Sequence, residues 1–226
     1  MSSLAHRHSA PATLDTRRIQ GLAAIVAGPL FFAIVAVLTR VELDFMHRLG
    51  WRFTGDDDVP WPSGLALGGA GAVQGANFAL AGILLALFTR GFRRELSASR
   101  SGRLAALLIA AIAGAFTLSA IPTDHATAVT GSPDTWHGYL HGIAFVVLMV
   151  ASLAAPLATA VALRGNPRWR RFPALSLAVV VLELALSVGL GSLGDPVFAA
   201  WLAVVFGWFA ALGAHLRRLQ EADPLR

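Results

Sequence analysis

The sequence predicts an all-α fold: a polytopic membrane bundle of six transmembrane helices with both termini in the cytoplasm. Its 226 residues are 56% hydrophobic and 14% charged, which leaves too few polar side chains to cover a soluble globule. Six apolar runs approach the roughly 20 residues that a spanning helix needs. The arginines are also distributed unequally among the segments that connect these runs.

The apolar runs define one transmembrane domain over residues 21–216. We expect its spans at 21–38, 63–88, 104–121, 136–163, 173–193 and 197–216. Residues 1–20 are polar without an apolar core and are expected to form a flexible cytoplasmic tail. Residues 217–226 form a second cytoplasmic tail.

Arginine placement predicts the orientation. All 18 basic residues are Arg, and 15 of them lie in the two tails, the second-to-third connection and the fourth-to-fifth connection. Only Arg40, Arg48 and Arg52 lie on the opposite side. The positive-inside rule then places both termini in the cytoplasm. This rule explains the basic charge without nucleic acid as a partner, so the expected partners are membrane lipids. A homo-oligomer is compatible with the sequence.

Missing residue types exclude several chemistries. The chain has no Lys, so no Schiff base can form, and we expect no retinal. It has no Cys, and therefore no thiolate nucleophile or cysteine metal site. Haem is not expected, because His137 and His141 share one helix instead of facing each other from two. No nucleotide is expected either, since the sequence has no P-loop.

The stretch PTDHATAVTGSPDTWHGYLH concentrates candidate ligands between two apolar runs. His137 and His141 are four residues apart, which places both rings on one helix face. Asp124 and His125 leave the preceding span on the same side of the membrane. Three histidines and an aspartate can form a tetrahedral Zn²⁺ set, or three ligands with a partner that orients one ring. The alternative is that these histidines anchor the helix at the membrane interface, where Asp134 or Thr135 would cap the start of the helix.

Two further polar sets remain as candidates. Ser119 lies within reach of the Asp124 region and is a candidate nucleophile, although back-bonding to its own helix is the alternative. Glu183 lies near the middle of the fifth span, where ionisable groups are costly and are functional by default. Gln74 lies at a similar depth, with Asn77 one turn beyond, so one of these amides is the predicted partner of Glu183.

Several motifs resemble a known family. VQGANFALAG in the second span, IPTD at the end of the third and WHGYLHG at the start of the fourth are similar to the bacterial six-helix membrane proteins of domain-of-unknown-function family 998. The likeness covers roughly residues 20–216. It implies a six-helix fold and a location in the bacterial inner membrane, without an established activity. Asn77, Asp124, His137 and His141 match the family's recurrent polar positions.

A weaker resemblance connects the chain to membrane hydrolases related to alkaline ceramidases. Those enzymes combine a Ser, an Asp and several His, including a His-x-x-x-His pair, around zinc. They have seven spans where this chain has six expected ones, and their His pair lies near the C-terminus.

Three functions remain open on these observations. The first is a metal-dependent intramembrane hydrolase of a lipid-like substrate, in which Zn²⁺ lowers the pKa of a bound water. The second is a small-molecule or proton-coupled transporter or sensor that uses Glu183. The third is a non-catalytic membrane scaffold, whose polar residues only join helices.

Overall fold

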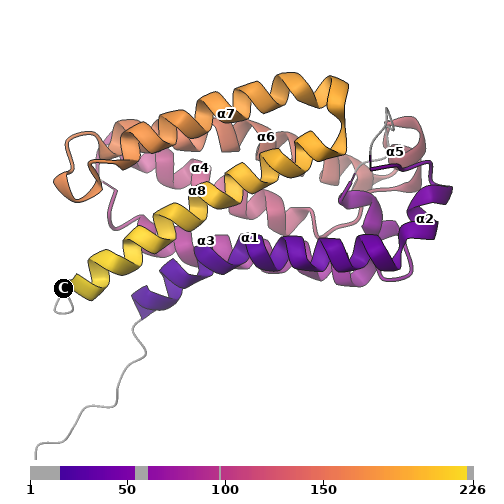
Figure 1. Cartoon of the computed structure of the whole chain (residues 1–226), viewed down its shortest axis with the longest axis horizontal. Helices are drawn as coiled ribbons and strands as arrows, with labels where there is room; N and C mark the ends of the chain where they lie inside the picture. Colours follow the sequence, from indigo (N-terminus) through magenta and orange to yellow (C-terminus); the bar gives the residue numbers. More distant parts are fainter. Residues whose placement is uncertain (1–15, 54–60, 97, 223–226) are drawn as a thin grey trace, which may run out of the picture.

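The structure is a computed structural model that describes residues 16–53, 61–96 and 98–222. These residues form helices connected by short turns and loops, and Figure 1 shows their arrangement. The elements are α1 (Thr16–Val41), α2 (Leu43–Arg48), η1 (Ser63–Leu67), α3 (Gly71–Phe92), α4 (Arg100–Leu118), α5 (His125–Thr130), α6 (Trp136–Leu163), η2 (Pro167–Trp169), α7 (Phe172–Leu193) and α8 (Asp195–Ala222), where η marks a 3₁₀ helix.

Five of the described helices are long and apolar enough to cross a bilayer, namely α1, α3, α4, α6 and α8. The apolar segment Phe172–Val188 of α7 is shorter. An all-helical chain with several such helices fits a polytopic membrane bundle. Only helices and closed barrels can satisfy the hydrogen-bonding needs of every backbone N–H and C=O group inside lipid. An α-helix does this with hydrogen bonds inside its own segment.

The second predicted span, 63–88, is wrong as a single helix. Ser63–Leu67 is a separate 3₁₀ turn, and α3 begins only at Gly71 and continues to Phe92. Glu42 lies at the break, where its carboxylate accepts the backbone N–H of Ala70 at 2.6 Å and fills the space beside Gly68. A carboxylate at a helix start also interacts favourably with the helix dipole.

Other helix ends differ from the expected ranges by a few residues. Residues 16–20 are helical and not part of a tail, α4 covers 100–118 where 104–121 was expected, and α8 continues to Ala222. Residues 1–15 and 223–226 lie outside the described part of the chain. Arginines lie at the three ends where a helix extends beyond its expected range, since a hydropathy pattern stops at the first charge although the backbone continues its hydrogen bonding.

The six long helices pack in a closed ring. Each packs against the next in the order α1, α3, α4, α6, α7, α8, and α8 returns to α1. Aromatic side chains from α1, α3, α4 and α8 meet on the inner side of the ring. The Phe31 ring centroid lies 5.4 Å from that of Phe78, 5.7 Å from Phe116 and 5.4 Å from Phe206. Such tilted and edge-on pairs add to the dispersion energy of the core.

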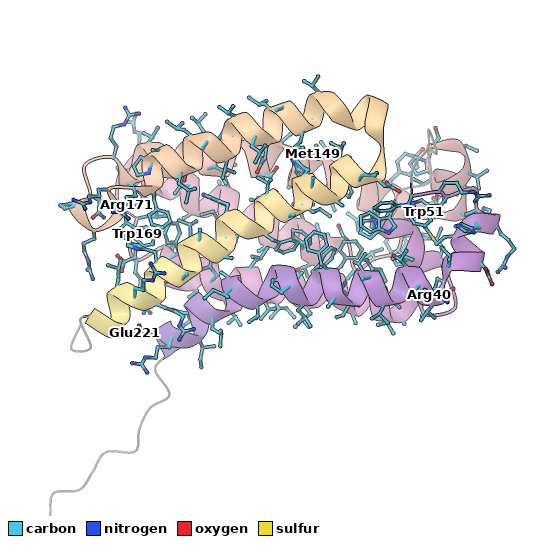
Figure 2. The ribbon with its side chains drawn as sticks, viewed as in Figure 1. Arg40, Trp51, Met149, Trp169, Arg171 and Glu221 are labelled. Carbon is cyan, nitrogen blue, oxygen red and sulfur yellow. The ribbon has the colours of Figure 1, made fainter. Side chains whose placement is uncertain are left out.

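The bundle has two chemically different ends. The described chain ends, at Thr16 and Ala222, lie together at the end that also carries η2 (Figure 1). We call this the arginine end, because the loops there carry most of the arginines. The opposite end, the histidine end, carries α2, η1, α5 and the start of α6. There, Trp51 donates its indole N–H to Asp195 at the first turn of α8. Figure 2 shows Trp51 at this end, with Trp169 and Arg171 at the other.

Close backbone approach joins α1 to α8. A Cβ atom at position 213 would lie 2.5 Å from the carbonyl oxygen of Gly21 and 2.8 Å from the Cβ of Ala24. Only glycine fits there, as in other membrane helix pairs that meet at small residues. Gly207, on the same helix, has no such neighbour within 4 Å.

We therefore expect Gly213→Ala to separate α1 from α8 and to destabilise the protein by about 1–3 kcal/mol, the usual cost of overpacking. Thermal unfolding of the purified protein in detergent measures this cost. Gly207→Ala is the matched control and should leave the melting temperature unchanged or raise it slightly, because alanine favours the helix. Equal effects of the two substitutions would contradict the close contact.

Candidate functional site

Asp124 organises the loop between α4 and α6. Its Oδ1 accepts the backbone N–H and the hydroxyl of Thr127 at 2.7 and 2.6 Å, which caps α5. Its Oδ2 accepts the backbone N–H of Asp134 at 3.1 Å, and the N–H and hydroxyl of Thr135 at 3.0 and 2.7 Å. Thr135 in turn caps α6 by accepting the N–H of Gly138 at 3.2 Å. One carboxylate thus fixes the starts of two helices.

These donors also set the charge state of Asp124. The hydroxyl of Thr127 lowers the pKa of the carboxyl most strongly, and the backbone N–H of Thr127 and both Thr135 donors lower it further. Burial acts in the opposite direction but does not cancel them. The pKa of Asp124 therefore lies well below its ordinary value, because hydrogen bonds to the ionised form favour that form. The side chain is a charged structural support.

His141, one turn into α6, joins this loop to η1. Its Nδ1 lies 2.8 Å from the carbonyl oxygen of Ile121, and its Nε2 lies 2.9 Å from the hydroxyl of Ser63. A carbonyl oxygen can only accept, so Nδ1 carries the proton in this arrangement. Nε2 then accepts the hydrogen bond that Ser63 donates. His141 is buried, at 7% exposure, and packs edge-on against Phe78.

The segment that carries Ser63 is held on both sides. Trp61 donates its indole N–H to the hydroxyl of Thr39 on α1 at 3.1 Å. The amide of Gln74 on α3 donates to the carbonyl oxygen of Pro62 at 3.3 Å. Asn77 donates to Gln74 at 3.3 Å and to the carbonyl oxygen of Phe31 at 3.2 Å. Gln74 and Asn77 therefore fix η1 in place. Ser63 itself is half-buried.

Sequence reasoning missed Ser63. It lies 78 positions before His141, at the expected start of an apolar span, and no spacing pattern connects the two residues. Ser119, the candidate nucleophile named from the sequence, donates to the carbonyl oxygen of Ala115 at 2.9 Å. This is the back-bonding alternative within α4.

The structure does not support the zinc hypothesis. Within the described part of the chain, no group of three His, Asp or Glu side chains could hold a metal ion. His125 is exposed at the start of α5, and the Nδ1 of His137 lies 3.2 Å from the carbonyl oxygen of Pro122. Both oxygens of Asp124 and both ring nitrogens of His141 are already used.

Glu183 lies in a different part of the ring. Its helix, α7, packs against α6 and α8. The side chain is 1% exposed, and neither carboxylate oxygen has a hydrogen-bond partner among the described residues. The predicted pairing with Gln74 or Asn77 is wrong, because both amides are engaged at η1 and α1. Ser152 of α6 lies beside Glu183, but its hydroxyl donates to the carbonyl oxygen of Met149 at 2.9 Å.

Apolar helices long enough to cross a bilayer, packed with a few buried polar contacts, define an integral membrane protein of the polytopic helical class. The chain belongs to the family described as "Protein of unknown function (DUF998)", whose family model matches residues 62–216. The match includes Ser63, Asp124, His141 and Glu183 and begins after α1. Searches of curated proteins and of solved structures gave no match, so the likeness to alkaline ceramidases has no support there.

The Asp124 contacts predict a large loss of stability in Asp124→Asn, because the amide presents N–H groups to donors that need an acceptor. We expect the melting temperature to fall by several degrees. Asp134→Asn is the matched control. Its side chain is exposed, and Asp134 contributes only its backbone N–H to this network.

The pH dependence of this effect has a fixed sign. Asp124 has a lower pKa in the folded protein than in the unfolded chain, so its contribution is fully present above the ordinary value of 3.8. It is lost as the pH falls below that value, because the unfolded chain then binds the extra proton. The stability difference between the wild type and Asp124→Asn should therefore narrow below pH 3.8 and stay constant above it. A constant difference at all pH values would contradict this role.

Proposed function

We propose that this protein is a membrane-embedded serine acyl hydrolase that acts on lipid-like esters at the histidine end, with Ser63 as nucleophile and His141 as general base. The observation that carries the proposal is the geometry of one ring: Nε2 lies 2.9 Å from Ser63 Oγ, while Nδ1 lies 2.8 Å from the carbonyl oxygen of Ile121. A nucleophile, a base and a group that orients the base are the parts that nucleophilic catalysis needs.

Each partner has a defined role in this reaction. As Ser63 Oγ attacks the ester carbonyl carbon, His141 Nε2 takes the hydroxyl proton. The carbonyl oxygen of Ile121 holds the Nδ1 proton and stabilises the imidazolium, a role that a carboxylate has in the usual triad. Collapse of the tetrahedral intermediate breaks the ester bond, and the leaving alkoxide takes the proton from Nε2. Water then cleaves the acyl-serine by the same transfers, releasing a carboxylic acid.

The surroundings favour an amphiphilic substrate. His141 is buried against Phe78, while Ser63 is half-buried at the end of the bundle. An ester carbonyl at the membrane interface lies at the depth of the first turns of a spanning helix, and His141 is six residues into α6. This chemistry needs no metal, and the described residues support the nucleophile better than the zinc-bound water expected from sequence.

We also propose six membrane crossings in a bacterial inner membrane, with both termini in the cytoplasm. Helix α7 has 22 residues, or about 33 Å at 1.5 Å per residue, which is enough for a bilayer core of about 30 Å. Both described ends of the chain lie at the arginine end, as an even number of crossings requires (Figure 1). The excess of arginine there supports the cytoplasmic assignment.

A second candidate function, a small-molecule or proton-coupled transporter or sensor, rests on Glu183. A buried carboxyl without a hydrogen-bond partner is costly, and proteins keep such groups in membranes mainly for function. Thr159 of α6 and Trp201 of α8 also have buried polar atoms without a partner among the described residues. The half of the ring built from α6, α7 and α8 therefore contains several unused polar groups.

The Ser63 proposal predicts covalent labelling by a fluorophosphonate probe, which reports an activated serine. Peptide mass spectrometry of the full-length protein in lipid nanodiscs should locate the label on Ser63. Labelling should be abolished in Ser63→Ala and slowed by roughly 100-fold or more in His141→Gln, which removes the base. Ser119→Ala is the matched control and should label as the wild type does.

Thermal unfolding of each variant separates chemistry from folding. A folded wild type that does not label would overturn the nucleophile assignment, and the Ser63–His141 contact would then serve only to hold η1 against α6. Unchanged labelling in a folded His141→Gln would remove His141 as the base.

The absence of partners at Glu183 predicts that Glu183→Leu stabilises the protein by about 1–3 kcal/mol, since an unpaired buried polar group is removed. Ser176→Ala on the same helix is the contrast. It should destabilise, because Ser176 accepts the indole N–H of Trp208 at 3.0 Å. Thermal unfolding in detergent compares the two. Destabilisation by Glu183→Leu would show that the carboxyl has a structural partner, and the transporter candidate would lose its support.

A further inference from the structure

A basic pocket lies at the arginine end, remote from the serine–histidine pair. It is formed by η2, the first turn of α7 and the last turns of α8, and has a volume of about 660 Å³. Its rim carries four exposed arginines, Arg168, Arg170, Arg171 and Arg218. Its wall between the two helices is apolar and includes Leu175 and Leu219. Figure 2 shows Arg171 at this end beside Trp169.

The backbone that carries these arginines is rigidly held. His215 of α8 donates its Nε2 proton to the carbonyl oxygen of Arg168 at 2.7 Å. The same ring packs against Trp169 and Phe172, with centroids 4.6 and 4.7 Å away. Trp169 is fully buried and donates its indole N–H to Glu95 at 3.2 Å. The pocket is therefore a built feature of the fold.

Among the described residues, no acidic side chain compensates the positive charge of the pocket. None of its lining residues is Asp or Glu, and none of its four arginines forms an ion pair with a residue that the structure describes. The nearby carboxylate of Glu221 pairs with Arg217 instead, at 3.7 Å. Four guanidinium groups around one opening leave a strong field for an anion.

We propose that this pocket binds an anionic phospholipid from the adjoining leaflet, with its phosphodiester among the arginines and its acyl chains along the apolar wall between α7 and α8. Guanidinium groups bind phosphate oxygens in pairs with good geometry. Basic pockets between transmembrane helices on the cytoplasmic side are suited to such headgroups. An apolar wall continuous with a phosphate site favours a lipid over a soluble phosphate.

The membrane orientation of the protein does not by itself explain why four arginines surround this pocket. The positive-inside rule requires arginines on one side of the membrane but not around one opening. Arg94, in the connection between α3 and α4, and Arg100, the first residue of α4, are exposed in the same part of the bundle, and neither lines this pocket. Substituting these two residues therefore removes the same amount of positive charge without altering the pocket, which makes them a suitable control.

The test is native mass spectrometry of the full-length protein in neutral detergent, titrated separately with phosphatidylglycerol, phosphatidylcholine and inorganic phosphate. We expect the wild type to retain phosphatidylglycerol at least about tenfold more tightly than phosphatidylcholine. The double variant Arg170→Gln/Arg171→Gln should lose about tenfold or more of this affinity. Inorganic phosphate should not displace the lipid at millimolar concentration, because it lacks the acyl chains.

The control Arg94→Gln/Arg100→Gln removes the same charge and should bind the lipid as the wild type does. Equal weakening in both double variants would overturn the pocket in favour of general charge attraction. Displacement by inorganic phosphate would assign the site to a soluble anion and overturn the lipid. Retained binding in Arg170→Gln/Arg171→Gln with an unchanged melting temperature would place the lipid elsewhere.

Discussion

The histidine end depends on one carboxylate. Five donors converge on Asp124, and they belong to the first turn of α5 and to the two residues that precede α6. The carboxylate lies so close to Gly138 that a Cβ atom there would meet it, so glycine is required where α6 passes Asp124. The same α6 carries His141, whose Nδ1 lies 2.8 Å from the carbonyl oxygen of Ile121.

The order of the helices in the closed ring decides which buried polar side chains find hydrogen-bond partners. On one side, Gln74 and Asn77 of α3 find partners on η1 and α1, so the cost of burying them is offset by hydrogen bonds. On the other side, Glu183 faces Ser152, whose hydroxyl is already used by its own helix. The two intramembrane polar sets therefore differ: Gln74 and Asn77 connect neighbouring segments, whereas the carboxylate of Glu183 has no hydrogen-bond partner among the described residues.

The two ends of the bundle are stabilised by different kinds of interaction. At the histidine end, short elements are fixed by neutral and charge-assisted hydrogen bonds around a serine and a histidine. At the arginine end, aromatic packing around Trp169 and His215 holds guanidinium groups at the opening of an apolar groove. The long helices keep these ends apart by the thickness of a bilayer, so each can be altered without the other.

Composition and the apolar runs determined the helical membrane class and the approximate positions of the long helices, because lipid demands long apolar segments with internal hydrogen bonds. Local pattern also narrowed the cap of α6 to Asp134 or Thr135 and offered back-bonding as one role of Ser119, because both features depend on near neighbours; the structure selects Thr135 and the back-bonding. Only the tertiary structure decided which polar residues meet. It gave Asp124 and His141 different hydrogen-bond partners, brought Ser63 to that histidine across 78 positions and left Glu183 without an amide partner among the described residues. The order of the helices around the ring sets these contacts, and the hydropathy of the sequence does not predict that order.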